Sequence, residues 1–231
     1  MMKRQSCLAI IPAREGSKGI KNKNIKHLNG KPLIYYSIRE AKKSKFIDKC
    51  IVSTDSKKIK KVALGFGAEV PFLRPKRIST DKTSMYSVVE HAVEFIKKQN
   101  QSFDIIVILQ PTSPLRKAED IDKAIKKLIT SKADSVVSVC VAEHSPYWMR
   151  IVQGGKVFPL IKSKEFLRRQ DLPEVYRING AIYATKKEVL FNQKRILGKN
   201  ILAFIMPQDQ SADIDTELDF KLTEIILKIK R

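Results

Sequence analysis

Two strongly apolar runs, at residues 7–12 and 104–109, stand out in the hydrophobic pattern of the chain. Apolar residues that follow one another without polar alternation predict central strands buried on both faces of a sheet. The remaining pattern predicts further strands at residues 49–55, 68–70, 135–141, 180–184 and 201–206, and helices at residues 32–41, 57–66, 88–98 and 119–131, with a last helix ending near residue 229. This order predicts an α/β fold with a mostly parallel central sheet and helices on both faces.

The alternation of helices and strands stops between residues 142 and 177. Apolar side chains surround a turn at Gly154-Gly155 in this segment, and the pattern predicts a β-hairpin. Trp148, Val157 and Phe158 belong to a segment too short to bury them by itself, which is typical of a flap or an oligomer interface. We therefore predict a single domain over residues 1–231, with residues 142–177 inserted in it as an arm.

A glycine-containing basic loop follows the first strand, which Pro12 closes. Glycines allow backbone N–H groups to turn toward a ligand, and the loop adds four cations: Arg14, Lys18, Lys21 and Lys23. The spacing matches neither the Walker loop nor the dinucleotide-binding turn. A solvated basic loop remains the alternative, but ligands of open α/β sheets bind beyond the carboxyl ends of central strands. The position therefore favours a cradle for a polyphosphate.

Two aspartates close to the last helix form a candidate metal site. Asp213 and Asp215 are two residues apart, so in an extended segment their carboxylates point to the same side, as a hard divalent cation requires. The alternative is that Asp215 or Thr216 caps the last helix, with Asp219 reaching back to it. A similar alternative applies upstream, where Ser79, Asp81 or Ser84 is a candidate cap for the helix that follows.

Composition narrows the function classes. The 231 residues are 43% hydrophobic and 30% charged, which is typical of a folded globular chain. No apolar run is long enough to span a bilayer, and no signal peptide is recognisable. Cys7, Cys50 and Cys140 are scattered and odd in number, which favours buried thiols in a reducing cytoplasm over disulfides or a metal site.

The formal net charge of +21 is spread along the whole chain. It favours capture of an anionic substrate. Because no known nucleic-acid-binding module is recognisable, we expect no nucleic-acid partner, and a basic RNA-binding protein remains a distant alternative. His27, His91 and His144 stand alone in the sequence, and we expect them to be structural or surface residues.

Six motifs occur in the order found in one enzyme family. They are residues 11–14, 17–19, 21–24, 110–116, 177–183 and 213–215. Together they resemble the acylneuraminate cytidylyltransferases, the CMP-sialic acid synthetases and their bacterial relatives, over residues 8–220. Glu15 departs from the pattern, because the family commonly has a small or neutral residue there. The resemblance implies a Rossmann-like nucleotidyltransferase fold whose hairpin is a dimerisation arm reaching into the neighbouring subunit's site.

The resemblance also implies a reaction and a set of site residues. CMP passes from CTP to the anomeric hydroxyl of a nine-carbon 2-keto sugar acid, of the N-acetylneuraminate or legionaminate type, and pyrophosphate leaves. The residues implied in CTP binding are Ala13, Arg14, Ser17, Lys18, Lys23, Asn24, Arg74 and Ser84. Those implied around the sugar acid are Gln110, Thr112, Ser113, Arg169, Arg177, Asn179 and Tyr183. Asp213 and Asp215 are implied to hold Mg²⁺, and with Arg14 and Lys23 they form the implied catalytic set.

The physical chemistry of the reaction agrees with these implied roles. Transfer at the α-phosphate requires charge neutralisation and a stabilised leaving group, which Arg14, Lys23 and a bound Mg²⁺ can supply. A guanidinium fork suits a planar carboxylate better than a lysine does, which favours Arg177 or Arg169 as the partner of the sugar acid. A cytidylyltransferase for an eight-carbon acid, such as 3-deoxy-manno-octulosonate, is the alternative, because it differs only in the details of the pocket.

Overall fold

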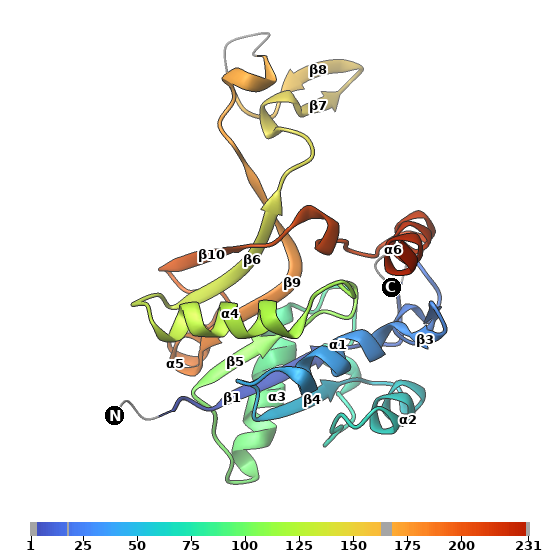
Figure 1. The fold of residues 1–231 in the computed structure, drawn as a ribbon, viewed down its shortest axis with the longest axis vertical. Coiled ribbons are helices and arrows are strands. Elements are labelled where there is room, and N and C mark those ends of the chain that lie inside the picture. The colour runs from blue at the N-terminus through green and yellow to red at the C-terminus, as the bar shows by residue number, and fades with distance from the viewer. Residues whose placement is uncertain (1–3, 18, 163–167, 230–231) are drawn as a thin grey trace.

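A six-stranded sheet forms the centre of the molecule (Figure 1). In spatial order its strands are β10 (Ile201–Ile205), β6 (Ser135–Val141), β9 (Tyr176–Lys186), β5 (Ile105–Ile108), β1 (Cys7–Pro12) and β4 (Lys49–Ser53). Strand β9 is antiparallel to both of its neighbours, and the other pairs are parallel. The computed structural model, which describes residues 4–17, 19–162 and 168–229, thus confirms the predicted mostly parallel sheet.

Helices cover both faces of this sheet, as predicted. One face carries α1 (Leu33–Lys43), α2 (Lys57–Gly65) and α4 (Ala118–Ile129), and the other carries α3 (Met85–Lys98) and α5 (Lys187–Asn192). Helix α6 (Glu217–Ile229) lies to one side, where Phe220 joins Ile20 and Leu33 in a separate apolar cluster (Figure 1). The last helix of the chain is therefore packed against the segment that follows β1.

The unbroken apolar pattern of β1 reflects burial on both faces. Cys7, Ala9 and Ile11 face the cluster formed with α1, α2 and α4, whereas Leu8 and Ile10 face the cluster formed with α3. Side chains of a strand alternate between the two faces, and all five are fully buried. The same holds for all four residues of β5. These two strands are the centre of the fold, as their sequences indicate.

Shorter elements complete the chain. A two-stranded ribbon, β2 (His27–Leu28) and β3 (Lys31–Pro32), turns at Asn29 and Gly30, which both have positive φ angles, as such tight turns require. Short 3₁₀ helices lie at Lys23–Ile25, Lys76–Ile78, Pro146–Trp148, Arg169–Asp171 and Gln208–Gln210. In the described part of the chain, no helix has the length and apolar character needed to cross a membrane.

Three sequence-based expectations need correction. Residues 68–70 form no strand: Glu69 makes a single parallel bridge with Ile51, and Pro71 then offers no N–H to continue the pairing. Strand β9 begins at Tyr176, before the predicted residue 180, because it continues from the arm. Cys50 is only partly buried, although Cys7 and Cys140 are buried as predicted.

The predicted hairpin is present and stands away from the body of the protein (Figure 1). Its strands are β7 (Arg150–Gln153) and β8 (Lys156–Pro159), joined at Gly154 and Gly155, whose φ angles are both positive. All eight strand residues are exposed. The ends of β6 and β9 carry this arm away from the sheet (Figure 1), so its apolar side chains do not reach the core.

Candidate active site

A cavity of about 600 Å³ lies where the loop after β1, the turn after β5 and the segment before α6 converge. Each of these loops follows or adjoins the carboxyl end of a strand, which is where open α/β sheets bind ligands. The cavity is lined by Arg14, Ser17, Lys23 and Asn24 from the opening loop, and by Arg74, Gln110, Thr112, Asp213 and Asp215 from the rest of the chain. The structure thus brings together nine of the residues implied by the sequence.

The opening loop is anchored so that Arg14 and Lys23 face this cavity. Ala13 is buried and its N–H donates to Ser53 O over 2.9 Å, and the buried Asn24 donates from Nδ2 to Arg14 O over 2.9 Å. The Arg14 guanidinium forms an ion pair with Asp81. Glu15, the departure from the family pattern, is exposed and does not line the cavity. It therefore adds no carboxylate to the lining of the cavity.

Lys23 connects this loop to the two aspartates. Its Nζ donates to Asp215 Oδ1 over 2.9 Å and to Ile214 O over 2.7 Å. The Lys23 side chain is largely buried, whereas three quarters of the Asp215 side chain is exposed. The loop after β1 and the segment before α6, which are about 190 residues apart, therefore share one charged contact at the cavity.

The structure shows which residues cap the last helix. Thr216 caps α6 together with Asp219: Asp219 Oδ2 accepts from Thr216 N over 2.7 Å, and Asp219 N donates to Thr216 Oγ1 over 3.2 Å. This is a reciprocal capping arrangement. The Asp215 carboxylate takes no part in it, and both Asp213 and Asp215 line the cavity. Their side chains are therefore on one side, as the two-residue spacing predicts.

Asp213 occupies a less polar environment than Asp215. Burial raises the pKa of the Asp213 carboxyl, and the Asp215 charge raises it further, while a hydrogen bond with Thr112 and the charge of Lys23 oppose the shift. The neighbouring Ile214 N donates to Thr112 O over 2.9 Å. Asp213 and Asp215 thus place two carboxylates at one cavity, and a bound cation would reduce the electrostatic repulsion between them.

Arg74 is a buried cation with unsatisfied donors. It is 5% exposed, and its Nε and Nη2 atoms are buried with no hydrogen-bond partner among the described residues. Asp55 Oδ1 lies 4.0 Å from Nη2. Burial lowers the pKa of the Arg74 guanidinium, and Asp55 partly offsets this. Buried donors without partners are costly, so a ligand oxygen in the cavity would satisfy them.

A second cavity of about 450 Å³ adjoins the first. The two share Met85 and Gln110, and the second is completed by Tyr183, Arg195, Ile196 and Leu197. Burial and the Asp213 charge raise the pKa of the Tyr183 hydroxyl, which keeps it protonated as a donor. Gln110 therefore lies between the two cavities. The first is lined by cationic side chains and aspartates, and the second by several apolar side chains.

Comparison with known proteins identifies the family. A family model described as cytidylyltransferase matches residues 8–220. This protein belongs to the cytidylyltransferase family. It is 39% identical over 228 residues to post-translational flagellin modification protein B of Campylobacter coli, which covers 96% of this chain and 95% of that protein.

Two further comparisons agree. This cytidylyltransferase is 37% identical over 229 residues to CMP-N,N'-diacetyllegionaminic acid synthase of Legionella pneumophila, with 97% of each chain covered. It shares its fold with a solved structure of CMP:2-keto-3-deoxy-manno-octonic acid synthetase in complex with CTP, at a TM-score of 0.74 and 17% identity, over 98% of this chain and 100% of the other. These findings confirm the resemblance drawn from the six motifs.

Several implied residues do not line either cavity of this cytidylyltransferase. Ser84 caps α3 by accepting from Ser87 N over 3.1 Å, which confirms it as the cap among the three candidates and starts the helix earlier than predicted. Ser113 and Asn179 are fully buried, and Arg177 donates from Nη2 to Ser211 O over 3.1 Å. Lys18 lies outside the described residues. Arg169 belongs to a 3₁₀ helix in the arm, and its side chain is not described.

Other lining residues were not anticipated from the sequence. Thr80, Asp81 and Thr83 come from the polar loop before α3. Of this loop, the resemblance implied only Arg74 and Ser84 in CTP binding. Arg195 and its apolar neighbours come from the loop after α5. A cluster of Ser, Thr and Asp is common in any exposed loop, so only the fold shows that this one faces the opening loop.

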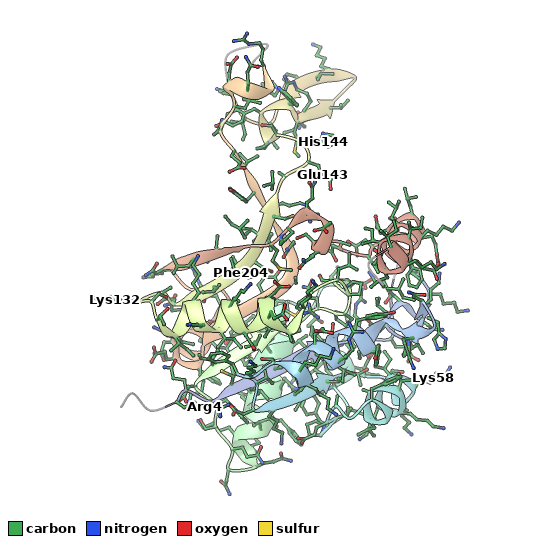
Figure 2. The ribbon with its side chains drawn as sticks, viewed as in Figure 1. Arg4, Lys58, Lys132, Glu143, His144 and Phe204 are labelled. Atoms are coloured by element: carbon green, nitrogen blue, oxygen red, sulfur yellow. The ribbon has the colours of Figure 1, made fainter. Side chains whose placement is uncertain are left out.

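The histidines lie away from both cavities, as expected. His27 and His144 are exposed, and Figure 2 places Glu143 and His144 on the stem of the arm. His91 packs edge-on against Phe72 with ring centroids 4.8 Å apart, and burial lowers the pKa of its imidazole. In this cytidylyltransferase, neither cavity is therefore lined by a histidine among the described residues.

Proposed function

We propose that this protein transfers CMP from CTP to the anomeric hydroxyl of a nine-carbon 2-keto sugar acid and releases pyrophosphate. The observation that carries the proposal is the pair of cavities that meet at Gln110. One offers the cations and carboxylates that a nucleoside triphosphate and its metal require, and the other offers a mixed apolar and polar surface for a second substrate. The names of the full-length relatives support the same reaction.

The first cavity fits CTP. Arg14, Ser17 and Lys23 provide donors and positive charge for the phosphates. The buried Arg74, with its unsatisfied Nε and Nη2 donors, is placed to bind oxygens of the cytidine. As the bond to the leaving pyrophosphate breaks, Arg14 and Lys23 stabilise the negative charge that develops.

Asp213 and Asp215 fit a Mg²⁺ ion, which we propose as the cofactor. Among the described residues, no group of three or more His, Cys, Asp or Glu side chains is arranged so that it could hold a metal ion by itself. Mg²⁺, however, is commonly bound by one or two carboxylates together with substrate phosphates, and both aspartates face the cavity. When bound, the ion would neutralise phosphate charge and lower the pKa of the attacking hydroxyl. Lys23, which bonds Asp215, is placed to move from the carboxylate to a phosphate oxygen.

The second cavity fits the sugar acid. Gln110 and Tyr183 offer an amide and a phenol for its hydroxyl or carboxylate groups, and Thr112 lies at the neighbouring nucleotide side. Met85, Ile196 and Leu197 provide apolar surface that suits acyl groups. The similarity to the Legionella pneumophila enzyme makes N,N'-diacetyllegionaminic acid the first substrate to test.

We also propose that the protein is a homodimer joined through its arm. Val152 and Val157 are 67% and 64% exposed, and Phe158 is 44% exposed. A second copy would cover these side chains, and Arg169 of the partner subunit would then approach the sugar acid. We place the reaction in the cytoplasm, where CTP is made, as a step toward cell-surface glycans.

The test is release of pyrophosphate from CTP with a panel of acids. N,N'-diacetyllegionaminate, N-acetylneuraminate and 3-deoxy-manno-octulosonate are compared at several Mg²⁺ concentrations, with ATP and UTP as nucleotide controls. We expect turnover with CTP and a nine-carbon acid. Turnover with 3-deoxy-manno-octulosonate alone would instead indicate that the substrate is an eight-carbon sugar acid. Salt-sensitive RNA binding without CTP turnover would contradict the proposal and favour a binding protein.

A further inference from the structure

We propose that Asn179 is a positioning residue that holds the Gln110 turn and the Asp213 segment in one arrangement, and that it does not contact the sugar acid. This inference rests on the proposed function for the roles of Gln110 and Asp213. It differs from the role that the motif around residues 177–183 implies, and it follows from the contacts of a single buried side chain.

The Asn179 side chain has no hydrogen-bonding capacity left for a ligand. It is fully buried. Its Oδ1 accepts from Ser138 Oγ over 2.6 Å and from Ala181 N over 3.2 Å, and its Nδ2 donates to Ser211 Oγ over 2.8 Å and faces Met206 Sδ at 3.5 Å. An amide side chain offers two acceptor positions and two donors, and all four are engaged within the protein.

Through Ser211, this side chain reaches the segment that carries the aspartates. Ser211 is fully buried, and its hydroxyl donates to Pro207 O over 2.8 Å while accepting from Asn179. Its carbonyl accepts from Arg177 Nη2 over 3.1 Å. Three residues later, Ile214 N donates to Thr112 O. The segment is therefore fixed on both sides of Asp213, and the contacts before it come from β9.

The backbone of Asn179 reaches the other half of the site. Its carbonyl accepts from the buried Ser113 Oγ over 3.3 Å, and Ser113 N in turn donates to Gln110 O over 3.3 Å. One residue thus bonds to the turn that carries Gln110 and to the segment that carries Asp213. A change at Asn179 or Ser211 would therefore alter the position of the Gln110 turn relative to the Asp213 segment, and with it the position of one proposed substrate cavity relative to the other.

The next residue shows how closely these parts approach one another. Gly180 has a φ angle of +73°, and a Cβ atom there would lie 2.7 Å from Gln110 Oε1 and 3.6 Å from Asp213 Oδ2. The pairing of β6 with β9 shifts register between Val137 and Val139, beside this position. Such irregularities bend a strand and re-aim its side chains next to active sites. The Asn179 side chain is buried close to this irregularity.

The variant that tests this proposal is Ser211→Ala, which removes one partner of Asn179 and leaves the implied substrate residues intact. Thr185→Val is the matched control. Thr185 is also a fully buried residue of β9 whose hydroxyl bonds a serine of β6, Ser135, over 3.0 Å, but it lies toward the other end of the strand from Asn179 and does not bond to the Gln110 turn or the Asp213 segment. Asn179→Ser is the direct variant, and its folding is checked by thermal unfolding.

Two measurements are made on each variant: amide hydrogen exchange across residues 211–216 without ligands, and Mn²⁺ affinity in the presence of CTP, from the signal of free Mn²⁺ in electron paramagnetic resonance. We expect Ser211→Ala to speed exchange and weaken Mn²⁺ binding, each by about fivefold, the effect of one net hydrogen bond. Asn179→Ser should show the same pattern, and Thr185→Val should match the unsubstituted protein in both.

Unchanged exchange and unchanged Mn²⁺ affinity in both site variants would overturn the proposal. So would a rise in the KM for the acid in Asn179→Ser that Ser211→Ala does not share, with exchange and Mn²⁺ affinity unchanged in both variants, because that result would make Asn179 a direct contact of the sugar acid. Failure of the unsubstituted protein to bind Mn²⁺ or to release pyrophosphate would instead contradict the proposed function. In that case, the exchange comparison of Ser211→Ala with Thr185→Val still decides whether Asn179 holds the segment.

Discussion

The first cavity, here called the pocket, and the arm differ in the partners that their side chains have. In the pocket, charged groups pair with one another across the cavity, as Arg14 does with Asp81 and Lys23 with Asp215. In the arm, Val152, Val157 and Phe158 stay exposed. A ligand can replace the partners of the pocket residues, but only another molecule can cover the arm. Substitutions in the pocket should therefore change catalysis, and substitutions in the arm should change association.

The largest effect is expected for Arg14→Ala. This change removes a guanidinium that faces the phosphate space, and loss of one donor that stabilises developing charge typically lowers the rate by about 10²–10³-fold. The measurement is pyrophosphate release from CTP. Lys21→Ala is the control, since Lys21 is an exposed cation of the same loop outside the cavity. Equal activity of the two variants would mean that the loop is only a basic surface.

Asp215→Asn should give the next largest loss. It keeps the shape of the side chain but removes a negative charge from the proposed metal site, so activity should fall by at least the roughly 10–100-fold that loss of an outer-sphere metal partner costs. Partial rescue at higher Mg²⁺ is expected. The melting temperature should hardly change, because the capping pair Thr216 and Asp219 remains intact.

Asp219→Ala is the contrasting variant for this site. It removes the acceptor of Thr216 N at the start of α6, so it should lower the stability by about 1 kcal/mol. Its metal dependence should resemble that of the unsubstituted protein. If Asp215→Asn lowered the stability and left the metal dependence unchanged, the aspartate would have a structural role.

Phe158→Glu tests the arm side of the comparison. A charge placed in a buried apolar contact should weaken the proposed homodimer by about 30-fold, as expected for a residue that contributes about 2 kcal/mol to an interface. Sedimentation at several protein concentrations measures this. Leu64→Glu is the control, since Leu64 is an apolar residue of α2 with a similar exposure of 50%. A stable monomer of the unsubstituted protein at micromolar concentration would contradict the dimer.

The sequence predicted the parts of the fold that follow from local pattern. The apolar runs of β1 and β5 indicated buried central strands, and the turn at Gly154-Gly155 indicated a hairpin. The direction in which a strand runs was harder to predict from the sequence. The sequence of β9 does not show that it runs antiparallel to β5 and β6, because that depends on where the chain returns from the arm. Residues 68–70 have the composition of a strand, but tertiary pairing gives them only one bridge.

The candidate site was predictable where the residue type suits the proposed role. Arg14, Lys23 and the two aspartates carry charges that suit phosphates and metal, and they meet in one cavity. For the other residues, whether they face a cavity depends on the fold, which buries some side chains and brings others together. The sequence around Asn179 does not show that the side-chain amide of this residue is hydrogen-bonded to Ser138 and Ser211. Arg195 lines the second cavity only because the loop after α5 folds back beside Tyr183.

The smallest effect is expected for the stability of Asp213→Asn, measured without metal in the presence of a chelator. Burial raises the pKa of Asp213 above its value of about 3.9 in an unfolded chain, so ionisation of this carboxyl opposes folding. The stability that the protonated form provides is complete below the unfolded pKa and is lost as the pH rises through the folded one. The asparagine variant should therefore melt at a temperature higher by no more than about 2–4 °C at pH 7, and the difference should vanish near pH 3. Glu143→Gln is the control for replacing an acidic side chain by its amide, because Glu143 is exposed on the stem of the arm, away from the cavity (Figure 2). A variant that is less stable than the unsubstituted protein at pH 7 would show that the ionised Asp213 is stabilised by its neighbours, chiefly Lys23 and Thr112, more than burial disfavours it.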